Sequence, residues 1–152
     1  MEWLAALRGQ IVGLDTAPLI YFIEEDPAYL EKVTPFFEAV DRGEFQVVTS
    51  AVTLLEVLVH PIRRGDAGLA LRYREILLGS RNVSCVALSN EIAEEAARLR
   101  AESNIRTPDA IHLATAVRAG AASFLTNDTH LPPLPTLRIL VLDELSSESP
   151  AP

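Results

Sequence analysis

Cysteine is nearly absent from this sequence, and long apolar runs are absent altogether. Cys85 is the only cysteine among 152 residues, so no disulfide can form within the chain. A lone thiol between Val83 and Val86 is typical of a protein from a reducing compartment. No apolar run reaches the roughly 18 residues of a membrane helix, and the first residues lack the basic start and apolar stretch of a secretory signal. We therefore expect a cytoplasmic protein with no membrane span.

Positive charge is scarce as well. The net charge is −8, and Lys32 is the only lysine, so the other basic residues are all arginines. Simple, non-specific nucleic-acid binding needs a basic surface that displaces counterions, and this charge argues against it. An enzyme that holds Mg²⁺ is still compatible with it, because acids at a metal site count as negative charge until a cation neutralises them.

The apolar content is sufficient for a hydrophobic core. Apolar residues make up 49% of the chain, and a length of about 100–200 residues is typical of one domain. We expect residues 1–145 to form a single domain and residues 146–152, which are rich in Ser and Pro, to be a disordered tail.

Short apolar runs alternate with helical patterns along the chain. The runs predict strands at residues 10–14, 45–48, 83–86, 123–125 and 138–142. Between them, apolar spacing and capping residues predict helices at residues 34–41, 66–78, 89–103 and 107–118. Two further helices are predicted, one through Leu19, Phe22 and Ile23 and one that Ser50 caps and that runs through Leu54, Leu55 and Leu58. Pro35 fits the first turn of the helix at residues 34–41. Strands separated by helices pair in parallel, so the pattern predicts an α/β fold, a three-layer sandwich whose central, mostly parallel sheet of about five strands is flanked by helices.

Two acids stand out from their surroundings. Asp15 directly follows the first apolar strand, where ligands bind in open α/β sheets, although a turn or helix cap explains it equally well. Glu56 lies inside the apolar segment AVTLLEVLV, where a buried carboxylate is costly unless it is paired or bound to a metal. The alternative is a polar helix stripe shared with Thr53 and His60.

Two further acids, Asp109 and Asp128, have ordinary structural explanations when taken alone and become candidate site residues only together with the first pair. Asp109 occupies the first turn of a predicted helix, where the helix dipole alone favours an acid. Asp128 follows the strand before it in an Asn-Asp turn, which is ordinary turn chemistry. Together with Asp15 they face one edge of the predicted sheet. Carboxylates that crowd together repel each other unless a hard cation is present, and Mg²⁺ and Mn²⁺ prefer such oxygen ligands.

The order and setting of these residues resemble the PIN domain, specifically its VapC-type toxin branch. The most specific segment is residues 106–116 (RTPDAIHLATA), and residues 14–22, 50–56 and 125–128 resemble the family's other motifs. The resemblance covers nearly the whole chain. It implies an endoribonuclease dependent on Mg²⁺ or Mn²⁺ that cleaves single-stranded or looped RNA, a cognate antitoxin partner and a homodimer.

The resemblance also assigns roles to individual residues. It implies that Asp15, Glu56, Asp109 and Asp128 are the catalytic, metal-binding acids, with Thr16 and Thr126 in supporting positions. The family often carries basic residues near the site, and here few are available. The candidates for RNA phosphate contacts are Arg63, Arg64 and Arg106.

Several other side chains have less specific interpretations. His112 is one turn after Asp109, and a hydrogen-bonding or packing role suits it better than metal ligation. Cys85 is expected to be a core residue of its strand rather than a nucleophile. The helix faces that carry Tyr21, Phe22, Phe36 and Phe37 are expected to be mostly core, and any part left exposed there could receive an antitoxin helix.

Other functions share parts of this pattern. A PIN nuclease for RNA maturation would carry the same acids without being a toxin. A phosphoacceptor signalling domain is also α/β, but it needs an adjacent acidic pair after its first strand and a late lysine. Here Leu14 precedes Asp15, and Lys32 is early. A domain that only binds RNA is disfavoured because all four acids are present.

Overall fold

The computed structural model describes residues 1–145, so the predicted tail at 146–152 lies outside the described residues. The elements are, in chain order, α1 (Glu2–Ala5), β1 (Ile11–Leu14), α2 (Thr16–Ile23), α3 (Leu30–Asp41), β2 (Gln46–Ser50), α4 (Ala51–Arg64), α5 (Ala67–Gly79), β3 (Val83–Val86), α6 (Asn90–Glu102), α7 (Thr107–Arg118), β4 (Ser123–Thr126), β5 (Arg138–Val141) and the 3₁₀ turn η1 (Leu142–Glu144). None of the helices in this part of the chain has the length and apolar character needed to cross a bilayer.

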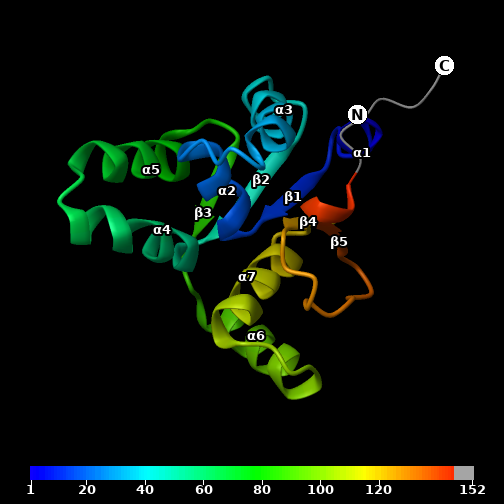
Figure 1. Cartoon of the computed structure of the whole chain (residues 1–152). Coiled ribbons are helices and arrows are strands. Elements are labelled where there is room, and N and C mark those ends of the chain that lie inside the picture. Colours follow the sequence, from blue (N-terminus) through cyan, green and yellow to red (C-terminus); the bar gives the residue numbers. More distant parts are fainter. Residues whose placement is uncertain (146–152) are drawn as a thin grey trace.

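The strands form a five-stranded parallel sheet in the order β3-β2-β1-β4-β5, which confirms the predicted fold class. Helices cover both faces (Figure 1). Helices α6 and α7 lie on one face, and α1, α2, α3 and α5 pack in the core of the other. The middle strands are short and apolar because both of their faces are buried.

Strand β1 shows how the two faces alternate. Val12 and Leu14 are buried in the core that contains α2 and α3, whereas Gly13 faces α7. A Cβ atom at Gly13 would lie 2.6 Å from a ring carbon of Phe124 and 2.7 Å from the Cβ of Ala116. Glycine therefore lets α7 pack closely against the centre of the sheet.

The strand order reverses at β1 and β4. From β1 the chain moves outward through β2 to β3, then returns to pair β4 with the other side of β1 before it adds β5. The segments after β1 and β4 thus leave the sheet in different directions. In open α/β sheets, the crevice at the carboxyl ends of such a strand pair is where ligands bind.

Helix α3 differs from its predicted boundary. It begins at Leu30 instead of residue 34, and Pro35 lies inside the helix instead of in its first turn. The chain enters the helix through a turn at Asp26, whose carbonyl accepts hydrogen bonds from the backbone N–H groups of Tyr29 and Leu30. That turn establishes helical geometry before Pro35, and the proline costs one backbone hydrogen bond within it.

Candidate active site

Asp15 lies where the strand order reverses. It follows β1 and caps α2, and its Oδ1 atom accepts a hydrogen bond from the backbone N–H of Thr16 at 2.8 Å. Its Oδ2 atom accepts a second one from the Thr126 hydroxyl at 2.7 Å. Its own N–H donates to the carbonyl of Leu125 in β4 at 2.9 Å. Asp15 is therefore fixed between β1 and β4, the two strands at which the strand order reverses.

Thr126 also connects this acid to Asp128. The backbone N–H of Asp128 donates to the Thr126 hydroxyl oxygen at 3.0 Å, so one hydroxyl contacts both acidic residues. The carboxylate of Asp128 accepts from the backbone N–H of His130 at 2.8 Å, which closes the turn after β4. The sequence predicted Asp128 in a turn, and the structure adds its connection to Asp15.

Glu56 reaches the same place from α4. Its Oε1 atom accepts a hydrogen bond from the Thr16 hydroxyl at 2.9 Å and lies 2.9 Å from Nε2 of His112. His112 is buried on α7, its Nδ1 atom lies 2.9 Å from the Ser50 hydroxyl, and Nε2 lies 4.0 Å from Oδ1 of Asp15. The hydrogen-bonding role predicted for His112 is thus confirmed, and the ring connects three elements.

These contacts favour the charged form of Glu56. The hydrogen bond from His112 lowers the pKa of the Glu56 carboxyl, and the Thr16 hydrogen bond acts in the same direction, while partial burial opposes both. The side chain is 36% exposed, so it is open to solvent on one side. Thr53, fully buried one turn earlier, adds a 3.1 Å contact to Thr16, whereas His60 is exposed.

Asp109 completes the group from the first turn of α7. Its side chain is only 14% exposed, and burial raises the pKa of its carboxyl. The negative charges of Asp15 and Asp128 raise it further, whereas Arg106, 3.4 Å away, partly compensates. Asp109 therefore lies within the electrostatic field of both other acids, and the structure brings the four predicted acids together.

The donor chemistry of this group fits a hard divalent cation. Asp15, Asp109 and Asp128 offer carboxylate oxygens, and their mutual repulsion is only partly offset by Arg106. Within residues 1–145, no three or more acidic, His or Cys side chains already surround a single cation position. Mg²⁺ does not need such a cage, since it keeps several waters and takes one or two carboxylates together with substrate phosphates.

The predicted arginines separate into two groups. Arg106 lies beside Asp109 and is exposed to solvent. Arg63 and Arg64 are exposed in the last turn of α4, about 11–12 Å along the helix from Glu56 at 1.5 Å per residue. Among the described residues, no salt bridge or side-chain hydrogen bond joins Arg63 or Arg64 to the four acids, whereas Arg106 contacts Asp109. Cys85 is half-buried in β3, and burial raises the pKa of its thiol, which disfavours the nucleophilic thiolate.

Some side chains at the site were not predicted. Ser50 was expected only to cap α4, and it also contacts His112. The sequence places Asn127 in a turn. In the structure its amide also donates to the Tyr21 hydroxyl at 3.3 Å and accepts from the backbone N–H of Asp143 at 3.0 Å. No local pattern indicates these contacts, because the partners lie far apart in sequence.

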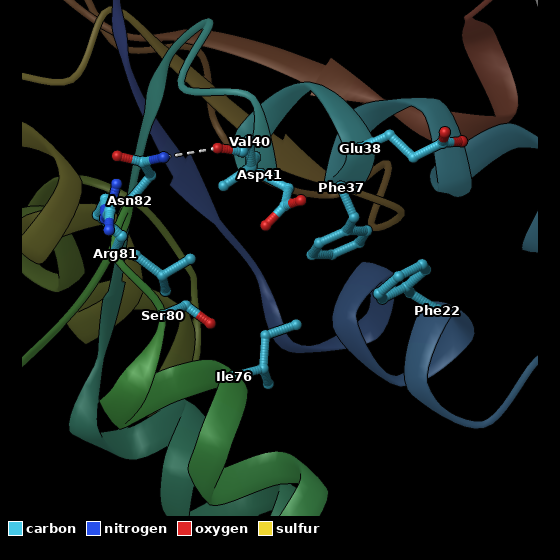
Figure 2. A pocket seen from close by; sticks show the side chains of 10 residues that line it. Phe22, Phe37, Glu38, Val40, Asp41, Ile76, Ser80, Arg81 and Asn82 are labelled. Carbon is cyan, nitrogen blue, oxygen red and sulfur yellow. Dashed lines mark hydrogen bonds between the residues drawn. The ribbon is translucent and has the colours of Figure 1, made fainter.

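A separate pocket of about 520 Å³ opens near the amino-terminal ends of β2 and β3, away from the acids. Figure 2 shows Phe22 and Phe37 lying side by side along one wall and Ile76 at the base of the view. Asn82 donates to the carbonyl of Val40 at 2.9 Å and joins two of its walls. Charged side chains at the pocket are Glu38, Asp41 and Arg81.

Several solved structures share this fold. A toxin–antitoxin complex from Klebsiella pneumoniae aligns with a TM-score of 0.67 at 24% identity, covering 90% of this chain and all of its own. VapBC2 from Rickettsia felis, bound to a promoter DNA fragment, aligns with a TM-score of 0.67 at 18% identity, covering 86% of this chain and 98% of its own. VapC20 from Mycobacterium tuberculosis, described as a sarcin–ricin loop cleaving toxin, aligns with a TM-score of 0.61 at 20% identity, covering 75% of this chain and 86% of its own.

Sequence comparison defines the family. No curated protein sequence matched the chain. Residues 12–135 match the PIN domain, a span that runs from β1 to the loop before β5 and includes all four acids. The chain therefore belongs to the PIN domain family.

Proposed function

We propose that this protein is an endoribonuclease that depends on Mg²⁺ or Mn²⁺. The observation that carries the proposal is the partly buried carboxylate of Asp109, whose pKa is raised by burial and by the charges of Asp15 and Asp128, the acids that follow β1 and β4. Such a group is stable in the charged state when a cation joins it. Membership of the PIN family and the likeness to a sarcin–ricin loop cleaving toxin support RNA as the substrate.

The chain's own residues divide the work. Asp15, Asp109 and Asp128 would hold the cation, and Glu56, kept charged by His112 and Thr16, would complete the set. A divalent cation held by these residues would supply an activated water and would stabilise the charge that develops on a phosphodiester. Thr126 orients Asp15 and the Asp128 turn at the same time.

Cleavage of RNA by purified protein tests the proposal. Asp109→Asn and Glu56→Gln are expected to reduce cleavage by at least about 100-fold, as loss of a catalytic group usually does. Glu102→Gln, an exposed acid at the end of α6, is the matched control and should cleave normally. Circular dichroism verifies folding. Full cleavage by the Asp109 variant, or wild-type cleavage in excess EDTA, would refute the metal-dependent mechanism.

We further propose that the nuclease is a toxin and that its antitoxin docks in the pocket of Figure 2. The structures from Klebsiella and Rickettsia are toxin–antitoxin complexes, which supports such a partner. The aromatic wall of Phe22 and Phe37 offers an anchor site for an apolar side chain. Glu38, Asp41 and the net charge of −8 favour a partner segment that also carries basic residues.

Expression in cells separates this proposal from an RNA-maturation nuclease. A toxin expressed alone should arrest growth, and Asp109→Asn should relieve the arrest; unaffected growth with active nuclease would favour maturation. For the partner, Ile76→Arg should prevent rescue by the antitoxin without reducing cleavage. Leu88→Arg, at an exposed apolar site away from the pocket, is the matched control.

A further inference from the structure

Almost all aromatic side chains of this protein are buried in the core or packed against it. The chain has one Trp, three Tyr and five Phe. The buried ones are Trp3, Phe36, Phe37, Phe45, Tyr73 and Phe124. Tyr21 and Phe22 are partly buried and pack against the core of α2 and α3. Tyr29 is the remaining aromatic residue, and it belongs to neither core cluster of the described residues.

Tyr29 has a defined position in spite of this. It precedes α3, and its ring stacks on the ring of Tyr21 with a centroid distance of 4.2 Å and an interplanar angle of 10°. Its hydroxyl donates to Oδ1 of Asp143 at 2.8 Å. That hydrogen bond raises the pKa of Tyr29, so the ring remains an uncharged phenol. The ring is therefore held at one face by Tyr21 and at its hydroxyl by Asp143, and the residue is partly exposed.

The same contacts connect Tyr29 to the turn that carries Asp128. The backbone N–H of Asp143 donates to Asn127, and Asn127 donates in turn to the hydroxyl of Tyr21. Asn127 lies between Thr126 and Asp128 in sequence. The pair of stacked rings is therefore joined by two side-chain contacts to the turn that carries one of the four acids.

An acidic nuclease needs a source of RNA affinity other than charge. The net charge is −8, and Arg106 is the only predicted RNA-binding arginine that the described structure places at the acids. Single-stranded nucleic acids also bind by stacking their bases on aromatic side chains, which is tolerant of sequence and independent of basic residues. Tyr29 has the ring, the partial exposure and the position that such stacking requires.

We propose that Tyr29, backed by Tyr21, is a stacking platform for one base of single-stranded RNA next to the phosphodiester that the acids cleave. The proposal rests on the ribonuclease function proposed above. It assigns to the stacked pair the base contact, and to the acids the contact with the phosphate.

Binding of fluorescein-labelled oligoadenylate and oligouridylate, followed by anisotropy, tests the platform. The parent protein carries Asp109→Asn so that the RNA stays intact. In that background, Tyr29→Leu removes the ring and should raise Kd about tenfold, which corresponds to about 1.4 kcal/mol. Tyr29→Phe is the matched control, because it keeps the ring and loses only the hydroxyl contact to Asp143. It should stay within about twofold of the parent.

Abasic substitution identifies the partner of the ring. Removal of one base next to the cleavage position should weaken binding by the parent protein and have no further effect in Tyr29→Leu. Equal Kd values for Tyr29→Leu and the parent would overturn the platform while leaving the nuclease intact. A loss of RNA affinity in Tyr29→Phe as large as that in Tyr29→Leu would overturn the platform in favour of a positioning role through Asp143. Absence of RNA binding by the parent would refute the nuclease proposal itself.

Discussion

Gly13 is the residue at which the close packing of sheet and helix can be tested most directly. An added Cβ would overlap a ring carbon of Phe124 and the Cβ of Ala116 at distances of 2.6 and 2.7 Å. Both neighbours are buried, so relief requires a shift of α7 or of the ring. We expect Gly13→Ala to lower the free energy of unfolding by about 1–3 kcal/mol, the usual cost of overpacking.

Urea denaturation measures this effect, and a second glycine serves as the control. Gly79 ends α5, and an added Cβ there would meet nothing within 4 Å. Gly79→Ala should therefore raise stability by about 0.5–1 kcal/mol, because alanine restricts the unfolded chain. If Gly13→Ala and Gly79→Ala changed the free energy of unfolding in the same direction, the close approach at Gly13 would be contradicted.

Asp109 is expected to destabilise the protein in the absence of a cation. Burial raises its folded-state pKa above the ordinary 3.8, so the folded protein disfavours the charged carboxylate. This penalty is absent below pH 3.8, grows as pH rises through the folded pKa and is complete above it. Asp109→Asn removes the penalty and should be more stable than the wild type at pH 7 without divalent ions.

Glu56 provides the comparison with the opposite sign. Its folded-state pKa is lowered, so its contribution to stability is present at neutral pH and is lost as pH falls through that pKa. Glu56→Gln should thus lose stability at pH 7. Urea unfolding at pH 7 and near pH 4 checks both variants, and added Mg²⁺ should narrow the gap for Asp109→Asn by stabilising the wild type. A destabilised Asp109→Asn protein would contradict the proposed charge repulsion.

At the scale of elements, two serine caps that look alike in sequence differ in what they hold. Ser89 accepts a hydrogen bond from the backbone N–H of Ile92 at the start of α6. Ser50 does the same for Val52 at the start of α4 and also contacts Nδ1 of the buried His112. Ser89→Ala should cost about 1 kcal/mol, whereas Ser50→Ala should cost about 2–3 kcal/mol because it also leaves a buried ring nitrogen unpaired.

Activity distinguishes the two caps further. Ser50→Ala frees the ring that contacts Glu56, so RNA cleavage should fall with it, while Ser89→Ala should leave cleavage unchanged. Thermal unfolding and cleavage assays of the two variants provide the measurements. Equal losses of stability would mean that the contact between Ser50 and His112 contributes nothing.

Caps also explain which elements could be predicted from sequence. The helices whose N-caps are Ser50, Asp66 and Ser89 begin within one residue of their predicted starts, because a polar side chain next to an apolar pattern marks each one. Helix α3 begins after Tyr29, whose side chain makes no capping hydrogen bond. Because proline is common in the first turn of a helix, Pro35 led to a predicted start for α3 at residue 34, four residues too late.

The site could be predicted only in part for a related reason. Asp15 and Asp128 follow strands, and in open α/β sheets ligands generally bind at the carboxyl ends of the strands, so these two acids could be predicted. The contact of His112 with Ser50 spans 62 residues, and that of Tyr29 with Asp143 spans 114. Such contacts depend on the angles at which helices pack, and a single sequence does not encode those angles in any local pattern.

At the scale of the whole molecule, the two proposed binding surfaces occupy different ends of the sheet. The acids lie at the carboxyl ends of β1 and β4, and the pocket near the amino-terminal ends of β2 and β3. A partner that only filled the pocket would not cover the acids. An antitoxin that blocks cleavage therefore needs a second segment that reaches across α2 or α4 to the carboxyl ends.

Net charge gives the last test, because it belongs to the molecule as a whole. Each phosphate that a basic side chain neutralises on single-stranded RNA contributes about −0.7 to the slope of log Kobs against log [salt]. With Arg106 as the only predicted arginine beside the acids, we expect a slope of about −1 or shallower at fixed Mg²⁺ in the Asp109→Asn protein. Arg106→Gln should flatten it by about 0.7. Anisotropy titrations across a series of KCl concentrations measure the slope. A value of about −3 or steeper would require several basic contacts, and would implicate Arg63 and Arg64 in place of base stacking as the main source of affinity.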